Sequence, residues 1–239
     1  MRSTKRPEIT LGFPGDPFTL FYDYDEVESG KISLLTREQK VEWFRRRLYM
    51  AFMEPLRRTL KERVVFESLL ESKLDEQKEC SFSVAAMGIM LNVVEALGAF
   101  RKPELAQTND RDGNWKMFLE FLSNHMKDWS INTTNNVFVP TVLWKSFRNG
   151  IAYDLRVGQV SEDNGLWGSL EFRGNFTDPN KKRFEKHRQL LRVCPEDFFD
   201  DLKSGVDDYF AKLCGDEQLL VSFGSRFNEV YPKRRAVEQ

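Results

Sequence analysis

The feature that most constrains the fold is a nearly continuous apolar run at residues 81–100, which reads SFSVAAMGIMLNVVEALGAF. A helix of this length is long enough to cross a membrane. However, Asn92 and Glu95 lie within the run, two glycines interrupt it, and charged segments flank it on both sides. We therefore predict a buried central helix of a soluble protein rather than a membrane-spanning segment.

Other segments are expected to pack around this helix as amphipathic helices. Their apolar residues recur every three or four positions, the period of a helix with one buried face. These segments are residues 36–60, 66–77, 114–129, 141–154, 193–213 and 217–231. Thr36 is followed three residues later by Gln39, the spacing of a capping box, so we predict that the first helix begins there. Pro55 is expected to kink this helix or to start a second segment.

A β-hairpin is expected directly after the 141–154 segment. Asn164 and Gly165 separate two short apolar runs, a pattern that favours a tight turn between antiparallel strands, so we place the hairpin at about residues 155–173. The predicted fold is thus mainly α, with one helical domain at residues 36–231. An N-terminal arm with a short extended segment (1–35) precedes it, and a flexible tail (232–239) follows it. The chain has 239 residues, 41% of them hydrophobic, which is enough for one large domain.

Composition excludes several classes of function. The net charge of -1 provides no overall basic field for nucleic acid, so any such contact must be local. Three widely separated cysteines form no disulfide framework, and two histidines are too few for a zinc site, so we expect neither metal nor cofactor. The N-terminus has no apolar stretch after its charges, which predicts a cytoplasmic protein.

Other polar residues are interpreted as structural. We expect His125 at the boundary of the core, without a ligand role. Two acidic pairs lie seven residues apart in the 193–213 segment and could suggest a metal site; they are Asp200, Asp201, Asp207 and Asp208. Because no histidine accompanies them and acidic helix faces are usually solvated, we interpret them as surface residues. The common nucleotide-binding and hydrolase motifs are missing from the sequence.

The candidate site lies at residues 141–154. Arg148 and Asn149 directly follow an apolar helical face, and Tyr153 comes five positions after Arg148. Glu95 lies in the apolar run, where a carboxylate needs a partner. In the functional interpretation Glu95 contacts Arg148. In the alternative its carboxylate reaches water or a surface lysine.

The sequence of residues 147–154, FRNGIAYD, resembles the Arg-Asn-x-x-x-His motif of the HEPN superfamily. These are all-helical proteins, many of them metal-independent ribonucleases of antiviral, toxin–antitoxin and CRISPR systems. The resemblance covers roughly residues 36–155. It implies an HEPN-like helical bundle, with the hairpin inserted after the motif helix, and a homodimer in which two motifs share one cleft. The implied catalytic residues are Arg148, Asn149 and Tyr153, and the implied binding residues are Glu95, Asp154 and Lys145.

Tyr153 stands where the family has its histidine. In metal-free RNA cleavage the ribose 2′-hydroxyl attacks the adjacent phosphate, and histidine can move the protons because it titrates near neutral pH. Tyrosine titrates near ~10 and is a poor base at neutral pH. Loss of a general acid or base typically costs about 10²–10⁴-fold in rate. Asp154 and Glu95 are alternative bases.

Three interpretations remain open at this point. The first is a divergent HEPN ribonuclease that uses Arg148, Asn149 and Tyr153 on RNA. The second is an HEPN-like module that has lost catalysis and serves in dimerisation or RNA binding, for example in phage defence. In the third, Arg148 and Asn149 only cap a helix and pair with Glu95.

Overall fold

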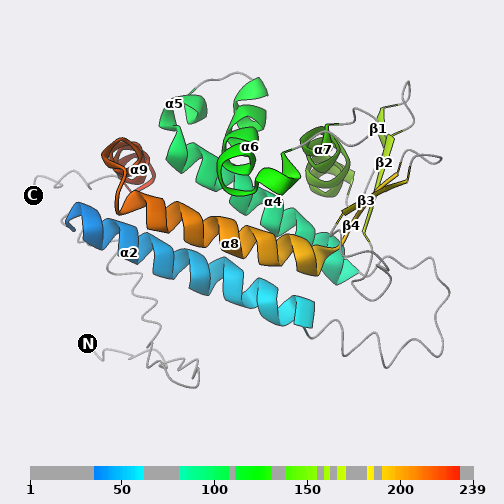
Figure 1. Cartoon of the computed structure of the whole chain (residues 1–239), viewed down its shortest axis with the longest axis horizontal. Helices are drawn as coiled ribbons and strands as arrows, with labels where there is room; N and C mark the ends of the chain where they lie inside the picture. Colours follow the sequence, from blue (N-terminus) through cyan, green and yellow to red (C-terminus); the bar gives the residue numbers. More distant parts are fainter. Residues whose placement is uncertain are drawn as a thin grey trace, which may run out of the picture.

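The structure is a computed structural model of the chain. It describes residues 35–61, 81–107, 111–130, 138–154, 159–161, 166–170, 182–185 and 190–231. Residues 1–34 of the expected arm, the expected 66–77 helix and the 232–239 tail lie outside the described residues. The described part is mainly helical, as predicted, and a small sheet lies at one end of the helical bundle (Figure 1).

The helices surround a central one, α4. In chain order the helical segments are α2 (Arg37–Leu48), the π-helix η2 (Tyr49–Met53), α4 (Ser81–Arg101), α5 (Pro103–Ala106), α6 (Arg111–His125), the 3-10 helix η3 (Lys127–Trp129), α7 (Val139–Val142), the π-helix η4 (Leu143–Asp154), α8 (Pro195–Leu213) and α9 (Glu217–Val230). Helix α4 packs against α6, η4, α8 and α9, and α2 runs alongside α8 (Figure 1).

The first helix begins as predicted. The hydroxyl of Thr36 accepts a hydrogen bond from the backbone N–H of Gln39 at 3.3 Å, and the Gln39 side chain accepts one from the Thr36 N–H at 2.9 Å. The helical run then continues through residue 61 without a break. Pro55 lacks an N–H and crowds the carbonyl four residues earlier. The wider turn of η2 lies just before it, which accommodates the proline without ending the helix.

Helix α4 forms the core, as predicted from its apolar sequence. Met87, Met90 and Leu97 are fully buried. Gly98 sits so close to α6 that an added Cβ would lie 1.8 Å from the carbonyl oxygen of Met117. The buried face does not extend all round, because a narrow strip of α4 is exposed; it consists of Ala85, Ile89, Asn92 and Ala96. Of the described helices only α4 has the length and hydropathy of a membrane span, and 61% of that window is buried inside the protein.

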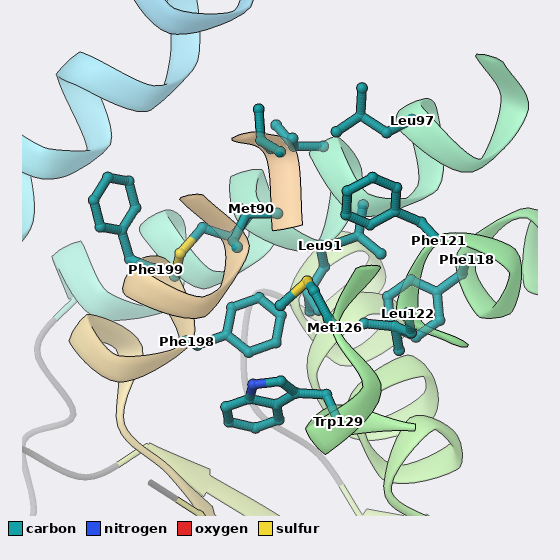
Figure 2. Packing of buried hydrophobic residues seen from close by; sticks show 14 of the residues in the cluster. Met90, Leu91, Leu97, Phe118, Phe121, Leu122, Met126, Trp129, Phe198 and Phe199 are labelled. Carbon is teal, nitrogen blue, oxygen red and sulfur yellow. The ribbon is translucent and has the colours of Figure 1, made fainter. Parts of the chain in front are cut away.

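Aromatic and aliphatic side chains of α4, α6 and α8 interlock in the core (Figure 2). Phe118, Phe121 and Leu122 of α6 face Met90 and Leu91 of α4, and Phe198 and Phe199 of α8 close the cluster with Met126 and Trp129. At the other end of the bundle α2 packs on α9. Trp43 contacts Tyr231 edge to face at 5.1 Å, and Arg37 pairs with Glu217 at 2.8 Å.

The predicted hairpin is present and belongs to a larger sheet. Strands β1 (Gln159–Ser161) and β2 (Leu166–Leu170) pair antiparallel within the predicted range, and both pack against η4. Strands β3 (Lys182–Glu185) and β4 (Leu190–Val193) form a second antiparallel pair. Strand β4 also pairs parallel with β2, which gives the order β1-β2-β4-β3. Strands β3 and β4 were not predicted. Strand β3 is mostly charged, and β4 is an apolar run too short to distinguish from the start of a helix.

Candidate functional site

The candidate motif lies on η4, a π-helix of 12 residues. Helix α7, which has Pro140 in its first turn, leads into η4. Leu143, Ser146 and Phe147 are buried, and η4 packs against α4. Trp144, Arg148 and Asn149 are partly buried and lie at the edge of the core. In a π-helix residues five apart are joined by a backbone turn, so Arg148 and Tyr153 are one turn apart along the backbone.

The guanidinium of Arg148 is paired with Glu95 of α4. Nε and Nη2 of Arg148 both donate to Oε2 of Glu95, at 3.1 and 3.0 Å. The side chains are 16% and 15% exposed, so both charges are largely removed from water. The contact that we considered for Glu95 from the sequence is thus present. It is required by the functional and by the structural interpretation alike.

Two further groups fix the orientation of Arg148. Nη1 donates to Oδ1 of Asn149 at 3.3 Å. The guanidinium carbon lies 4.7 Å from the ring centroid of Trp144, within range of a cation–π interaction. Because η4 continues to Asp154, Arg148 and Asn149 lie inside the helix rather than at its end. The expectation that they cap a helix is therefore wrong, although the pairing with Glu95 is correct.

Part of the Arg148 guanidinium remains available. A guanidinium has five N–H groups, and Glu95 and Asn149 accept three of them. The remaining two, one on Nη1 and one on Nη2, have no partner among the described residues. The terminal edge of a guanidinium is the fork that binds a phosphate or a carboxylate through two parallel hydrogen bonds. Glu95 occupies the lateral edge and Asn149 accepts one N–H of Nη1, so one N–H on each terminal nitrogen remains for a ligand.

The other predicted site residues lie on the same helix. Lys145 is exposed. Tyr153 and Asp154 form the last turn of η4, and their side chains lie outside the described part of the structure. The structure thus brings Glu95, Arg148 and Asn149 into contact and places the other three candidates on the motif helix.

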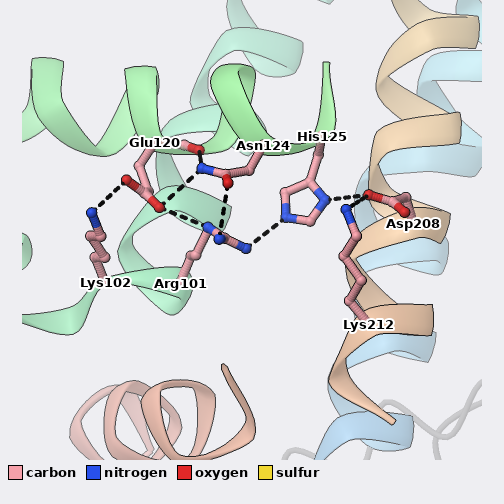
Figure 3. Close-up of polar contacts among 7 residues, drawn as sticks. All are labelled: Arg101, Lys102, Glu120, Asn124, His125, Asp208 and Lys212. Carbon is pink, nitrogen blue, oxygen red and sulfur yellow. Dashed lines mark hydrogen bonds and ion pairs between the residues drawn. The ribbon is translucent and has the colours of Figure 1, made fainter. Parts of the chain in front are cut away.

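A second polar cluster was missed from the sequence (Figure 3). Arg101, at the end of α4, donates to Glu120 at 2.7 Å, to Asn124 at 3.0 Å and to Nε2 of His125 at 3.1 Å. Nδ1 of His125 lies 2.7 Å from Asp208 on α8. Lys102 and Lys212 complete the cluster through Glu120 and Asp208, respectively. The cluster joins α4, α6 and α8.

His125 is half-buried as a residue, as expected at the boundary of the core, and its side chain is 0% exposed. Arginine can only donate, so Nε2 accepts and Nδ1 carries the proton that is donated to Asp208. Burial lowers the pKa of His125, and the charges of Arg101 and Lys212 lower it further against the opposing effect of Asp208. A neutral histidine with both nitrogens engaged is a structural link and not a proton carrier.

The position of His125 also separates it from the motif. Its partner Arg101 comes six residues after Glu95, which is about 9 Å farther along α4. His187 lies outside the described residues. No described histidine therefore accompanies Arg148.

The acidic pairs of α8 lie at the surface, as expected: Asp200 is exposed, and the side chains of Asp207 and Asp208 are 40% and 43% exposed. Three of the four residues, Asp201, Asp207 and Asp208, also contact other helices. Asp207 accepts a hydrogen bond from the hydroxyl of Tyr49 at 2.5 Å, and Asp201 accepts one from the indole N–H of Trp129 at 2.9 Å. Among the described residues no group of acidic, histidine or cysteine side chains could hold a metal ion. The partners come from other helices, so the sequence carried no signal for these contacts.

Comparison of the chain with protein-family models, curated proteins and solved structures finds no match.

Proposed function

We propose that this chain is a divergent HEPN-like protein that binds RNA phosphodiesters at Arg148 and cleaves them slowly without a metal ion. The observation that carries the proposal is that two N–H groups of the Arg148 guanidinium, one on Nη1 and one on Nη2, have no partner among the described residues. Glu95, Asn149 and Trp144 hold this group in place before any ligand binds. A preorganised fork loses little side-chain entropy on binding a phosphate, which makes it a good anion ligand.

The chemistry follows from the motif. The ribose 2′-oxygen attacks the adjacent phosphorus, the bond from phosphorus to the 5′-oxygen breaks, and a cyclic phosphate and a 5′-hydroxyl result. Arg148 stabilises the charge that develops on the phosphate oxygens. Asn149 orients Arg148 through its amide oxygen. Tyr153 occupies the position of the family's histidine and supplies a proton to the leaving oxygen, while water takes the proton of the 2′-hydroxyl.

The slow rate has a physical reason. Tyrosine is a weak base at neutral pH, and a missing general base costs about 10²–10⁴-fold. We propose that two copies act together as a homodimer, as in the family that the motif resembles, in a phage-defence or toxin-type system.

A second candidate is an HEPN-like module that binds RNA or dimerises but does not cleave. The commitment of His125 to Arg101 and Asp208 favours it, since that histidine cannot replace the missing base. Both candidates share the Arg148 anion site. They differ only in whether the RNA bound there is cleaved.

Cleavage of a labelled RNA in the presence of a chelator tests the proposal. We expect slow cleavage by the unaltered chain, a loss of about 10²–10³-fold in Arg148→Ala, and a gain in Tyr153→His. Arg47→Ala is the matched control, because Arg47 also lies four residues after a tryptophan and 5.4 Å from its ring, but on α2.

Each outcome decides between the candidates. Equal cleavage by the unaltered chain and Arg148→Ala refutes the ribonuclease. RNA binding that needs Arg148, without cleavage, supports the non-catalytic module. Binding that does not change in Arg148→Ala leaves the Arg148–Glu95 pair as a structural contact.

A further inference from the structure

We propose that Trp115 and Trp144 form a stacking subsite for an unpaired nucleobase beside the phosphate bound at Arg148. This inference rests on the proposed RNA-binding function and adds residues that select the ligand. Trp115 comes from α6 and Trp144 from η4, and their ring centroids lie 5.7 Å apart. The Arg148 guanidinium lies 4.7 Å from the Trp144 ring, so Trp144 directly adjoins the anion site and Trp115 adjoins Trp144.

These two tryptophans differ from those of the core. Trp129 is fully buried, and its indole N–H donates to Asp201 at 2.9 Å. Trp115 and Trp144 are only partly buried. In the described part of the chain neither of their indole N–H groups has an acceptor, and neither nitrogen is among the buried polar atoms without a partner. The indole nitrogens of both rings are therefore not fully shielded from solvent.

Buried residues hold the two indoles in place. Phe118 is fully buried, stacks on Trp115 at 6.0 Å with an interplanar angle of 23°, and lies 5.2 Å from Trp144. Phe138 contacts Trp115 edge to face at 6.5 Å. The rings are thus supported from within the core and from one side, which favours a rigid surface over a pair of mobile side chains.

The combination of groups matches the two halves of one nucleotide. Proteins that bind single strands pair basic groups on the phosphates with aromatic rings on the bases. One sugar connects a base to its phosphate, so a stacking surface must lie next to the anion site, as it does here. A base within a duplex is already stacked on both faces and cannot occupy the subsite. We therefore assign the subsite to an unpaired base, with purines favoured by their larger rings.

Fluorescence anisotropy with a short labelled oligoadenylate tests this assignment. The variant is Trp115→Leu, because Trp144 also positions Arg148. We expect its affinity for oligoadenylate to fall by about 5- to 150-fold. Its affinity for an abasic ribose-phosphate oligomer of the same length should not change. The matched control is Trp43→Leu: Trp43 is also half-buried and lies beneath an arginine, but it packs on α9. This control should bind both oligomers like the unaltered chain.

Three results overturn the subsite: unchanged oligoadenylate binding in Trp115→Leu, an equal loss with the abasic oligomer, or an equal loss in Trp43→Leu. If Trp115→Leu does not fold by circular dichroism, Trp115→Phe replaces it and must show a smaller loss of the same kind. If Trp115→Phe shows no such loss of affinity, the subsite is also overturned. Loss of binding in Arg148→Ala with no loss in Trp115→Leu removes the subsite and keeps the proposed function. An unaltered chain that binds no RNA refutes both.

Discussion

Glu95 and Arg148 stabilise each other in surroundings that neither would tolerate alone. Both side chains are mostly shielded from water, and one carboxylate oxygen receives two hydrogen bonds from the guanidinium. Removing one member of such a pair leaves the other charge poorly solvated. The pair therefore contributes to stability whether or not Arg148 binds a ligand.

We predict that Glu95→Gln lowers the free energy of unfolding by about 1–3 kcal/mol, since it leaves a shielded guanidinium without its counter-charge. The measurement is chemical denaturation at neutral pH. The matched control is Glu42→Gln, which removes an exposed partner of Arg46 on α2. That variant should cost less than about 1 kcal/mol. Equal losses in the two variants would show that the Glu95 pair behaves like a surface contact.

At the scale of elements, the close approach of α4 and α6 depends on one missing side chain. A Cβ at Gly98 would meet the Met117 carbonyl oxygen at 1.8 Å, and a backbone oxygen cannot move aside without moving its helix. We predict that Gly98→Ala destabilises the fold by about 1–3 kcal/mol, the usual cost of overpacking. Thermal unfolding measures the effect.

Gly224 provides the opposite case on α9. A Cβ there would have nothing within 4 Å. Alanine favours a helix over glycine by about 0.5–1 kcal/mol, so Gly224→Ala should raise the melting temperature. If Gly98→Ala and Gly224→Ala shift the melting temperature in the same direction, the close contact between α4 and α6 does not control stability.

The His125 cluster makes the junction of α4, α6 and α8 sensitive to acid. The pKa of His125 is lowered in the folded state, so below its unfolded value of about 6.5 the unfolded chain binds more protons. The stability that the neutral histidine provides is thus complete above about pH 6.5 and is lost as the pH falls through the lowered pKa. The groups that face the ring are Arg101, Asp208, Lys212, Tyr209 and Phe121.

We expect the free energy of unfolding to fall between pH 6.5 and pH 4.5, and to fall less steeply in His125→Gln, which cannot titrate. Urea denaturation across this range measures both slopes. The carboxylates of Asp208 and Glu120 have lowered pKa values, so their contribution is lost only at lower pH. If the free energy of unfolding falls equally steeply with pH in the unaltered chain and in His125→Gln, a group other than His125 causes the fall.

At the scale of the whole molecule, the proposed function requires a second copy. Sedimentation velocity at micromolar concentration should give the mass of a dimer. A monomer under these conditions would contradict both HEPN-like candidates, because the family's cleft forms between two copies. It would leave the structural interpretation of Arg148 in place.

The sequence predicted the parts of this molecule that depend on local pattern. The apolar run predicted α4, the Thr36–Gln39 spacing predicted the start of α2, and Asn164–Gly165 predicted the antiparallel pairing of β1 with β2. A carboxylate within an apolar helix also indicated the pairing of Glu95. The contacts that were missed join distant segments. His125 and Asp208 lie 83 residues apart, and no periodicity indicates which helices bring them together.

The pairing of the first described helix with the last has a consequence for synthesis of the chain. Trp43 of α2 packs on Phe227 of α9 and on Tyr231 just after it. During translation α2 therefore leaves the ribosome long before its partner exists, and one side of Trp43 remains uncovered until α9 and Tyr231 have been synthesised. Contacts of such long sequence separation form late, since their loop must close first. Nascent chains that stop before Glu217 therefore expose apolar surface, which a chaperone can bind.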